Sequence, residues 1–452
     1  MQKVYLLLAM ALLTFVSMWG QLRDSAELQK LEPFHAVDAS ASPRISRLRA
    51  DIDAGQSARV SQFWDEIQLQ QSPLVEPVPG DRHSSLVTFL WRGQSDTHNV
   101  VLIGGAAGTD LKKNQMYHLD GSDVWFKTYK IRNDARFIYS LSPNDSLIPI
   151  EKIDPKDREA MNKRLSDLRP DPLNPRHDPG LMPSSYVELS EAPPQTYITP
   201  DARVPKGKVE KRRFSSAILR NERDVWVYTP PGFRQTGGHY PLLVLFDGPS
   251  YIDIVPTPVI LDNLIAKGLI PAMVAISVGN TTAGSRAFEL SCSAEFADFL
   301  ATEIAPFMRK NYNATEMANN VAVGGSSLGG LAAAFAALKH PEVFGNVLSQ
   351  SGSFWWKPEG QASPEWLTKQ FADSPKLNIR MFLEVGLMED GATLTGPSML
   401  DTNRRMKDVL IGKGYAIHYQ EFNGGHEYLN WRGSFADGLI YLFGDWKSRA
   451  SR

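Results

Sequence analysis

The sequence predicts an α/β domain, with a mostly parallel sheet covered by helices on both faces, preceded by a small all-β sandwich of the immunoglobulin-like kind. First, buried apolar runs such as 241–246 and 272–278 alternate with helical stretches in the second half of the chain. Second, an apolar run at 321–323 breaks into glycines around a serine and continues as an Ala-rich helix. Third, short alternating runs separated by Gly or Asn/Asp turns fill residues 84–142.

The composition is that of a globular protein and excludes several classes. The chain has 452 residues, which suits about two to three domains. Its 48 Lys and Arg residues are balanced by 50 Asp and Glu residues, so no basic field points to nucleic acid. Cys292 is the only cysteine, which excludes an internal disulfide and a cysteine-rich metal site. Because His-Glu-x-x-His and glycine-rich nucleotide motifs are absent, we expect neither a metal nor a cofactor.

The N-terminus has the pattern of a secretory signal. Lys3 precedes an apolar run at 4–16, and small residues follow it. The run is short for a membrane-spanning helix, which needs about 20 residues, although Trp19 could anchor an uncleaved segment at the interface. We therefore expect residues 1–20 to be a signal sequence or an N-terminal anchor. The protein is expected to be periplasmic or secreted, with membrane contact only through this segment if it is retained.

Composition divides the rest of the chain into four segments. Residues 21–80 are polar and mostly helical in character. Residues 81–149 hold the predicted β-sandwich. Residues 150–205 are crowded with proline, which is typical of a long connecting arm. Residues 206–452 contain the alternating strands and helices and are the predicted catalytic domain.

Gly325, Ser327 and Gly329 form a Gly-x-Ser-x-Gly motif between a predicted strand and a predicted helix. In a nucleophile elbow this motif makes a strained turn that raises the serine hydroxyl above the sheet, and its glycines allow a close backbone approach. A bare motif of this kind also occurs in ordinary tight turns, but the flanking strand and helix favour the elbow. We therefore expect Ser327, and not Ser326, to be a nucleophile in an α/β-hydrolase domain.

A serine hydroxyl needs a base within reach and a group that orients the base. In the α/β-hydrolase fold these follow in the order serine, acid, histidine. His426 lies in a glycine loop after the last predicted strand, which makes it the expected base, whereas His340 and His418 lie in regular elements. Glu389 and Asp390 both follow the strand at 381–385, so the residues alone leave the acid open between them.

The oxyanion of an ester-hydrolysis intermediate needs two backbone N–H donors. One is expected from Leu328, because it begins the helix after the nucleophile and its amide has no intrahelical partner. By analogy with the fold, the second comes from the loop after the strand at 241–246. Gly248 is the candidate in that loop.

These motifs together resemble the enterochelin (ferric enterobactin) esterases, within the esterase D-like branch of the α/β-hydrolases. The resemblance covers roughly Ser84 to the C-terminus and includes an upstream β-sandwich and arm. Its combined motifs are far more specific than the elbow alone. They are residues 171–174, 245–248, 286–292, 321–331, 347–356, 383–389, 424–426 and 431–433.

The resemblance implies hydrolysis of the serine trilactone of a tris-catecholate siderophore such as enterobactin, with ferric iron present only as part of the substrate. It places Ser327, His426 and Glu389 at the positions of the family's triad, which favours Glu389 over Asp390. A ferric tris-catecholate is anionic and aromatic, so guanidinium groups and aromatic faces suit it. The residues that we expect near the ligand are Arg286, Arg432, Trp355 and Trp356.

Two other interpretations remain open from the sequence. The protein could be an exported carboxylesterase for another bulky acyl ester, such as a feruloylated polysaccharide, with the β-sandwich as a carbohydrate-binding module. It could also be a non-catalytic siderophore or glycan binder that has kept the fold. A complete set of Ser327, His426 and Glu389 argues against the binder.

Overall fold

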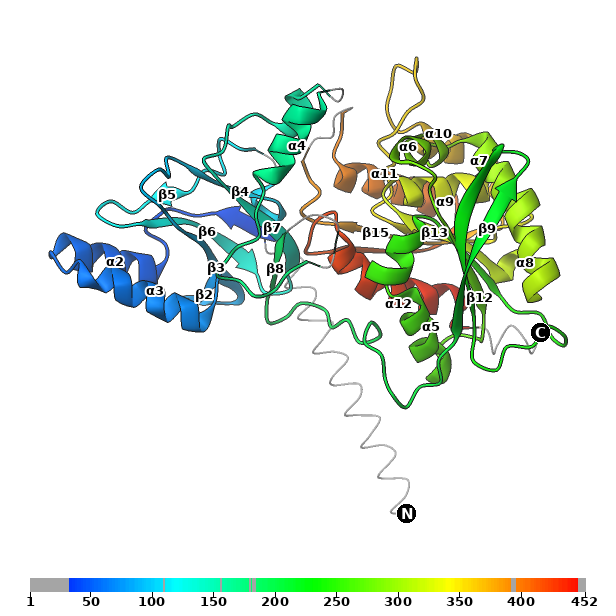
Figure 1. Cartoon of the computed structure of the whole chain (residues 1–452). Coiled ribbons are helices and arrows are strands. Elements are labelled where there is room, and N and C mark those ends of the chain that lie inside the picture. Colours follow the sequence, from blue (N-terminus) through cyan, green and yellow to red (C-terminus); the bar gives the residue numbers. More distant parts are fainter. Residues whose placement is uncertain are drawn as a thin grey trace. The chain divides into compact units, whose positions relative to one another are not determined.

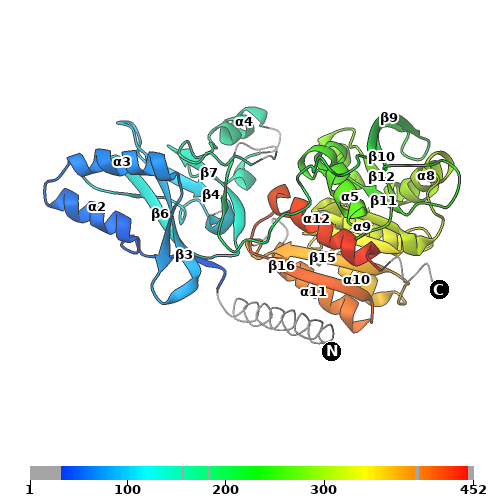
Figure 2. The same cartoon turned by 90° about the horizontal axis from the view of Figure 1, so that it is seen from below.

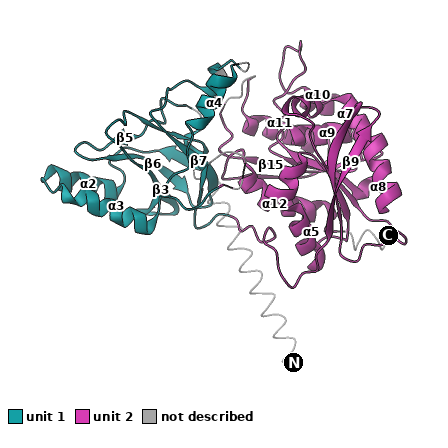
Figure 3. Cartoon of the chain, viewed as in Figure 1, with its two compact units in different colours: residues 1–177, 184–192 teal, residues 178–183, 193–452 magenta. Residues whose placement is uncertain are grey.

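The structure, a computed structural model, describes residues 32–445 except for 109, 155–156, 179, 181–183 and 392–395. The predicted signal or anchor at 1–20 lies outside the described residues. Contacts divide the chain into two compact units, one of residues 1–177 and 184–192 and the other of residues 178–183 and 193–452 (Figure 3). Among the described residues, no helix is both long and apolar enough to cross a membrane.

The second unit is built on an eight-stranded sheet in the order β16-β15-β14-β13-β11-β12-β10-β9. The six strands from β16 to β12 run parallel, and β10 and β9 continue the sheet antiparallel. In chain order the strands are β9 (Lys208–Ser216), β10 (Asn221–Thr229), β11 (Leu242–Leu245), β12 (Val274–Val278), β13 (Val321–Ser326), β14 (Asn346–Gln350), β15 (Arg380–Gly386) and β16 (Ala416–Phe422).

Helices cover both faces of this sheet (Figures 1 and 2). Within β11, Leu243 and Leu245 pack against α5 and α12, whereas Leu242 and Val244 belong to the core that faces α7, α8, α9, α10 and α11. The helices are α5 (Thr257–Ala266), α6 (Ala283–Glu289), α7 (Ala294–Phe299), α8 (Ala305–Tyr312), α9 (Leu328–Lys339), α10 (Trp366–Asp373), α11 (Met399–Gly412) and α12 (Tyr428–Phe443), with short helical turns at Ser250–Ile254, Leu300–Ile304 and Ala318–Asn320. The predicted α/β class is therefore confirmed.

The first unit contains two antiparallel sheets, as the predicted all-β part requires. One has the order β1-β6-β3-β2 with β5 added against β6, and the other has the order β4-β7-β8. Helices α2 and α3 pack Ile45, Phe63 and Ile67 over the first sheet. The elements are β1 (Phe34–Ala36), α2 (Pro43–Asp53), α3 (Ala58–Gln70), β2 (Leu74–Val78), β3 (Asp81–Arg92), β4 (Val100–Ile103), β5 (Tyr117–His118), β6 (Val124–Arg132), β7 (Arg136–Pro143), α4 (Arg158–Ser166) and β8 (Ser185–Glu188), with short turns at Gly105–Ala107 and Ile150–Lys152.

The proline-rich stretch at 150–205 contains more regular structure than its composition indicates. It includes helix α4 and strand β8, and β8 pairs with β7 inside the first unit. Farther along, the side chain of Asn263 donates hydrogen bonds to the carbonyl groups of Tyr197 and Thr199 at 2.9 and 3.0 Å. These hydrogen bonds hold the end of the stretch, at residues 197–199, to α5 within the second unit.

Candidate active site

The turn between β13 and α9 has the strained geometry expected of a nucleophile elbow. Ser327 has φ +59° and ψ −124°, a conformation that a non-glycine residue rarely adopts. Its N–H donates to the carbonyl of Gln350 at 2.9 Å, and its carbonyl accepts from the N–H of Ser353 at 3.0 Å. A Cβ on Gly325 would lie 3.0 Å from the backbone of Gly329, so a larger residue would force the turn open.

Only one of the two adjacent serines is accessible. Ser327 is partly exposed, and its Oγ lies 3.4 Å from the Oγ of Ser353. Ser326 is the last residue of β13 and has 1% of its surface exposed. The strained turn therefore presents the hydroxyl that the motif predicts and buries its neighbour.

His426 and Glu389 are joined by a short hydrogen bond. His426 Nδ1 lies 2.6 Å from Glu389 Oε2, with 3% of the Glu389 side chain exposed and 38% of the His426 side chain exposed. An ionised carboxylate only accepts, so Nδ1 carries the proton and Nε2 is left with its lone pair. Asp390, the alternative acid, is exposed. The structure therefore brings Glu389 to the imidazole.

The sheet places these groups at the same edge. Ser327 follows β13, Glu389 follows β15 and His426 follows β16, and the carboxyl ends of parallel strands share one edge. The loop of His426 is tied to that of Glu389, because the N–H of Met388 donates to the carbonyl of Gly424 at 3.0 Å. The two loops therefore form one packed unit at this edge.

The two predicted oxyanion donors lie beside neighbouring strands. Leu328 is the first residue of α9, and Gly248 follows β11, which pairs with β13. A Cβ on Gly248 would lie 2.4 Å from the ring of Trp226, so this position admits only glycine. Asp247, at φ +54°, turns the chain just before it. The local geometry is therefore that of a tight backbone loop next to the serine turn.

Arg286, predicted to contact a ligand, is bound to a carboxylate of the protein. Its Nε and Nη2 donate to the two oxygens of Asp247 at 2.5 and 2.7 Å, and Asn280 Nδ2 donates to the same carboxylate at 2.7 Å. Asp247 is 4% exposed, so this bidentate pair fixes the loop that carries Gly248. Much of the charge of Arg286 is thereby compensated within the protein.

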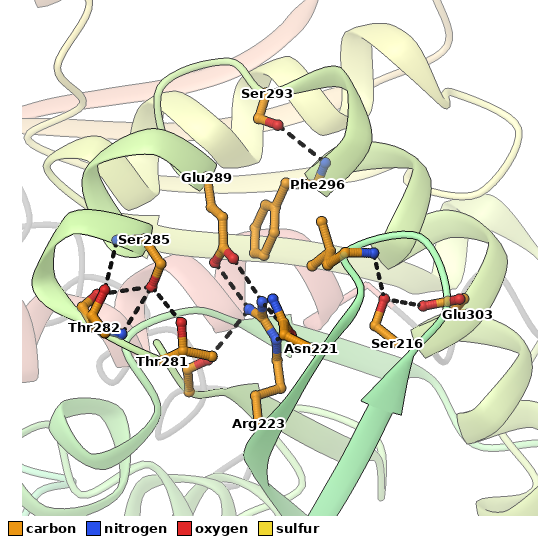
Figure 4. A network of polar contacts seen from close by, with 12 residues as sticks. Ser216, Asn221, Arg223, Thr281, Thr282, Ser285, Glu289, Ser293, Phe296 and Glu303 are labelled. Carbon is orange, nitrogen blue, oxygen red and sulfur yellow. Dashed lines mark hydrogen bonds and ion pairs between the residues drawn. The ribbon is translucent and has the colours of Figure 1, made fainter.

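Helix α6, which carries Arg286, is anchored by a buried ion pair that sequence reasoning missed (Figure 4). Arg223, 1% exposed, donates to both oxygens of Glu289 at 2.6 and 2.9 Å. The helix begins at a capping box between Thr282 and Ser285. Because Arg223 and Glu289 lie 66 residues apart, no local pattern could have paired them. The Arg223–Glu289 ion pair therefore fixes the C-terminal end of α6, the helix whose Arg286 binds Asp247.

The other predicted ligand contacts have different surroundings. Trp356 packs against Trp366 with ring centroids 6.0 Å apart and an interplanar angle of 87°, so it belongs to the core margin. Trp355 is half-buried, and its indole N–H has no hydrogen-bond partner among the described residues. Arg432 donates from Nε to Gln195 Oε1 at 2.8 Å. The three side chains therefore differ in how far the protein itself already binds them.

Glu384 is a fully buried carboxyl on β15. Its oxygens accept hydrogen bonds from the side chains of Gln350, Ser434 and Gln420 at 2.8, 2.5 and 3.0 Å. Burial raises the pKa of Glu384 to about 7, although these three donors act in the opposite direction. The folded protein therefore holds a proton on Glu384 over a pH range in which an unfolded chain would have lost it.

This raised pKa gives a stability prediction with a definite sign. Below pH 4.5 the Glu384 carboxyl is protonated in both the folded and the unfolded state. Between pH 4.5 and the folded pKa of about 7 the unfolded state loses this proton first, so the free energy of unfolding falls as the pH rises. We expect Glu384→Gln to gain roughly 3 kcal/mol relative to the parent between pH 4.5 and pH 8, since one pKa unit is about 1.4 kcal/mol. Urea unfolding at a series of pH values measures this, with the exposed Glu359→Gln as control. A gain that is the same at pH 5 and pH 8 would rule the prediction out.

Within the described part of the chain, no group of three or more His, Cys, Asp or Glu side chains is placed to hold a metal ion.

The second unit has the fold of an α/β-hydrolase, with the serine turn and the His426–Glu389 pair at the carboxyl ends of its parallel strands. Residues 216–442 match a family model described as "Putative esterase", and residues 86–198 match a model described as the N-terminal domain of enterochelin esterase. The chain therefore belongs to the enterochelin esterase family, and it is a hydrolase.

Named relatives agree over most of the chain. An iron(III) enterobactin esterase of Escherichia coli O6:H1 is 31% identical over 79% of this chain and 91% of its own length. An iron(III) salmochelin esterase of the same strain is 29% identical over 88% of this chain and 98% of its own length. The structure of an enterobactin esterase from Shigella flexneri, determined in the presence of enterobactin, is 28% identical with a TM-score of 0.66 and covers 84% of this chain and 97% of its own.

Proposed function

We propose that this protein is a serine esterase that hydrolyses the ester bonds of a catecholate siderophore, such as the trilactone of ferric enterobactin. The observation that carries the proposal is the strained Ser327 turn together with the His426–Glu389 hydrogen bond, in a chain of this family. The substrate class is supported by relatives named iron(III) enterobactin esterase and iron(III) salmochelin esterase. Iron takes part only as cargo of the substrate.

The proposed acylation step begins when Ser327 Oγ attacks the carbonyl carbon of one lactone ester and His426 Nε2 accepts the hydroxyl proton. The oxyanion that forms receives hydrogen bonds from the backbone N–H groups of Leu328 and Gly248. When the tetrahedral intermediate collapses, the ester C–O bond breaks. The leaving alkoxide then takes the proton from His426, which leaves an acyl-enzyme on Ser327.

The deacylation step reverses these roles with water. His426 Nε2 takes a proton from a water molecule, whose oxygen attacks the acyl carbonyl carbon. The bond from that carbon to Ser327 Oγ then breaks, and the serine oxygen regains its proton from His426. The products are a carboxylic acid and an alcohol, here the two ends of an opened lactone ring. Throughout, Glu389 keeps the imidazole in the tautomer that can accept at Nε2.

We further propose how the ligand-facing residues divide their work. Trp355 and Arg432 are candidates for contact with catecholate rings and charge, because both side chains are partly exposed and an indole ring and a guanidinium group suit an anionic aromatic ligand. Trp356 packs against Trp366 at the core margin, so we assign it a structural role beside the site. Arg286 contributes to the site through Asp247, by holding the loop of Gly248.

We also propose that the protein acts outside the cytoplasm, in the periplasm or as a secreted enzyme. The support is the apolar run at 4–16 behind Lys3, which has the pattern of an export signal. Fractionation of cells that express the full chain, followed by N-terminal sequencing, tests this. A protein found only in the cytoplasm with Met1 intact would contradict it.

A substrate panel tests the function directly. We expect kcat/KM for ferric enterobactin to exceed that for methyl ferulate by at least about 100-fold, because a site shaped for a large anionic aromatic ligand discriminates in the transition state. Initial rates should be measured on ferric enterobactin, its glucosylated forms, methyl ferulate and p-nitrophenyl acetate. The blank for every substrate is Ser327→Ala. A preference for methyl ferulate would overturn the siderophore assignment and leave the esterase mechanism standing.

A further inference from the structure

Two buried side chains, Ser351 and Trp431, form a hydrogen-bonded chain that ends on the Glu389 carboxylate, on the side away from His426. Ser351 follows β14, is 0% exposed, and donates from Oγ to Glu389 Oε1 at 2.6 Å. Trp431 lies on α12, is 3% exposed, and donates from Nε1 to Ser351 Oγ at 3.1 Å. The N–H of Gly386 also donates to Oε1, at 2.8 Å. The carboxylate is therefore held by donors on both oxygens.

The direction of each hydrogen bond in this chain is fixed by chemistry. An indole N–H can only donate, so Ser351 Oγ must accept from Trp431. The single proton of that hydroxyl is then free for one acceptor, and it points at Glu389. Successive bonds that run the same way polarise one another. The chain from Trp431 to Glu389 therefore ends on the oxygen opposite the one that holds His426.

Both side chains are also fixed in place by contacts other than this chain. Ser351 has φ +46°, and its N–H donates to the carbonyl of Glu384 at 2.8 Å. The ring of Trp431 packs edge to face against the imidazole of His426, with centroids 4.8 Å apart and an interplanar angle of 87°. Trp431 thus touches the imidazole directly and reaches its carboxylate partner through Ser351. Trp431 therefore fixes the imidazole of His426 and also, through Ser351, the carboxylate that orients it.

We propose that Ser351 and Trp431 are positioning residues for the reaction, which set the rotation of the Glu389 carboxylate and, through it, the Nε2 direction of His426. The proposal rests on the proposed roles of Ser327, His426 and Glu389. A carboxylate with a donor removed can rotate about its last bond, and the imidazole rotates with it. Because general-base catalysis requires hydrogen-bond geometry to the nucleophile, such rotation lowers turnover more than it lowers substrate affinity.

Ser351→Ala and Trp431→Phe test the proposal in the full-length protein. Trp431→Phe keeps an aromatic ring against His426 and removes the N–H. We expect Ser351→Ala to lower kcat on ferric enterobactin about tenfold, in the range for a lost hydrogen bond to a charged group. Trp431→Phe, which removes a hydrogen bond to a neutral hydroxyl, should lower kcat about fivefold, and KM should stay within about twofold in both variants. The rate at which a fluorophosphonate inactivates the enzyme should fall by a similar factor. This second rate depends on the activated serine and not on recognition of the siderophore.

The chain offers a matched control for each variant. Ser349 on β14 is also 0% exposed, and its hydroxyl has no hydrogen-bond partner among the described residues, so Ser349→Ala should leave kcat unchanged. Trp64, 4% exposed in the first unit, donates from Nε1 to Asp123 at 2.7 Å, so Trp64→Phe removes a part-buried indole hydrogen bond far along the chain. Thermal unfolding of all four variants separates a loss of stability from a loss of geometry.

A double-mutant cycle separates this proposal from the one on which it rests. If Ser351 acts through Glu389, adding Ser351→Ala to Glu389→Gln should cost less than about threefold, against about tenfold in the parent. An equal tenfold cost in both backgrounds would show a merely structural role and overturn the proposal. Wild-type kcat in both Ser351→Ala and Trp431→Phe would overturn it too. If Glu389→Gln itself were fully active, the acid assignment would fail, whatever the Ser351 result.

Discussion

Ser327→Ala is expected to abolish ester hydrolysis, with a loss in kcat on the order of 10⁶, the scale found when a serine hydrolase loses its nucleophile. The reason is that the alanine side chain cannot form the acyl-enzyme, while the strained turn at φ +59° and the backbone donors remain. A fluorophosphonate should label the parent protein at Ser327 alone. Mass spectrometry of the digested protein locates the label, and initial rates on ferric enterobactin and p-nitrophenyl acetate measure the loss.

The adjacent serine is the control for this result. Ser326 has the same side chain but is 1% exposed at the end of β13. Ser326→Ala should therefore keep the label at Ser327 and retain activity within about tenfold, since the loss of one buried hydroxyl costs on the order of 1 kcal/mol. A label on Ser326, or active enzyme with no labelled serine, would refute the nucleophile assignment. Equal inactivation by the two substitutions would leave the choice of serine without support.

The serine turn was predictable because its signal is local. Gly325, Ser327 and Gly329 lie within five residues, and the strained φ needs the glycines on either side for space. The same holds for the alternation of apolar strands and helices that predicts the sheet. The fold class, the family and the general kind of enzyme are confirmed.

The acid could not be chosen from the residues alone. Glu389 and Asp390 follow the same strand, and the chain decides between them by how the loop turns after Gly386. In the structure the N–H of Gly386 donates back to Glu389, which directs this carboxylate inward and leaves Asp390 exposed. Only the family resemblance separated the two beforehand. The hydrogen bonds that hold Glu389 come from the backbone of Gly386 and from the distant Ser351, and neither has a sequence pattern of its own.

Long-range polar pairs were the least predictable features. Arg286 is predicted to contact a ligand, yet the structure places it on helix α6 and pairs it with Asp247, 39 residues away. Trp431 and Ser351 lie 80 residues apart. Such pairs form only when the sheet brings distant loops to one edge. Periodicity and spacing carry no information on such pairs. The ligand contacts of Arg286, Arg432, Trp355 and Trp356 therefore stay predictions.

His426→Ala is expected to lower kcat by about 10⁴-fold or more, with little change in KM, because the imidazole acts on the transition state and not on the bound substrate. Glu389→Gln should also be strongly impaired, and Asp390→Asn should stay within about threefold of the parent. Steady-state kinetics on ferric enterobactin give kcat and KM for all three. Asp390→Asn is the matched control, since it removes one carboxylate charge from the adjacent exposed position.

The severity of Glu389→Gln follows from the donors around this side chain. Oε1 accepts from the N–H of Gly386 and from the hydroxyl of Ser351, while Oε2 accepts from His426 Nδ1. A glutamine has one oxygen, and the backbone N–H of Gly386 cannot change its role, so that oxygen remains on the Oε1 side. The amide NH₂ then faces His426 Nδ1 and forces the proton onto Nε2. An imidazole protonated at Nε2 cannot accept from Ser327, so turnover falls while the fold persists. If Asp390→Asn proved the more damaging of the two, this account of the acid would be wrong.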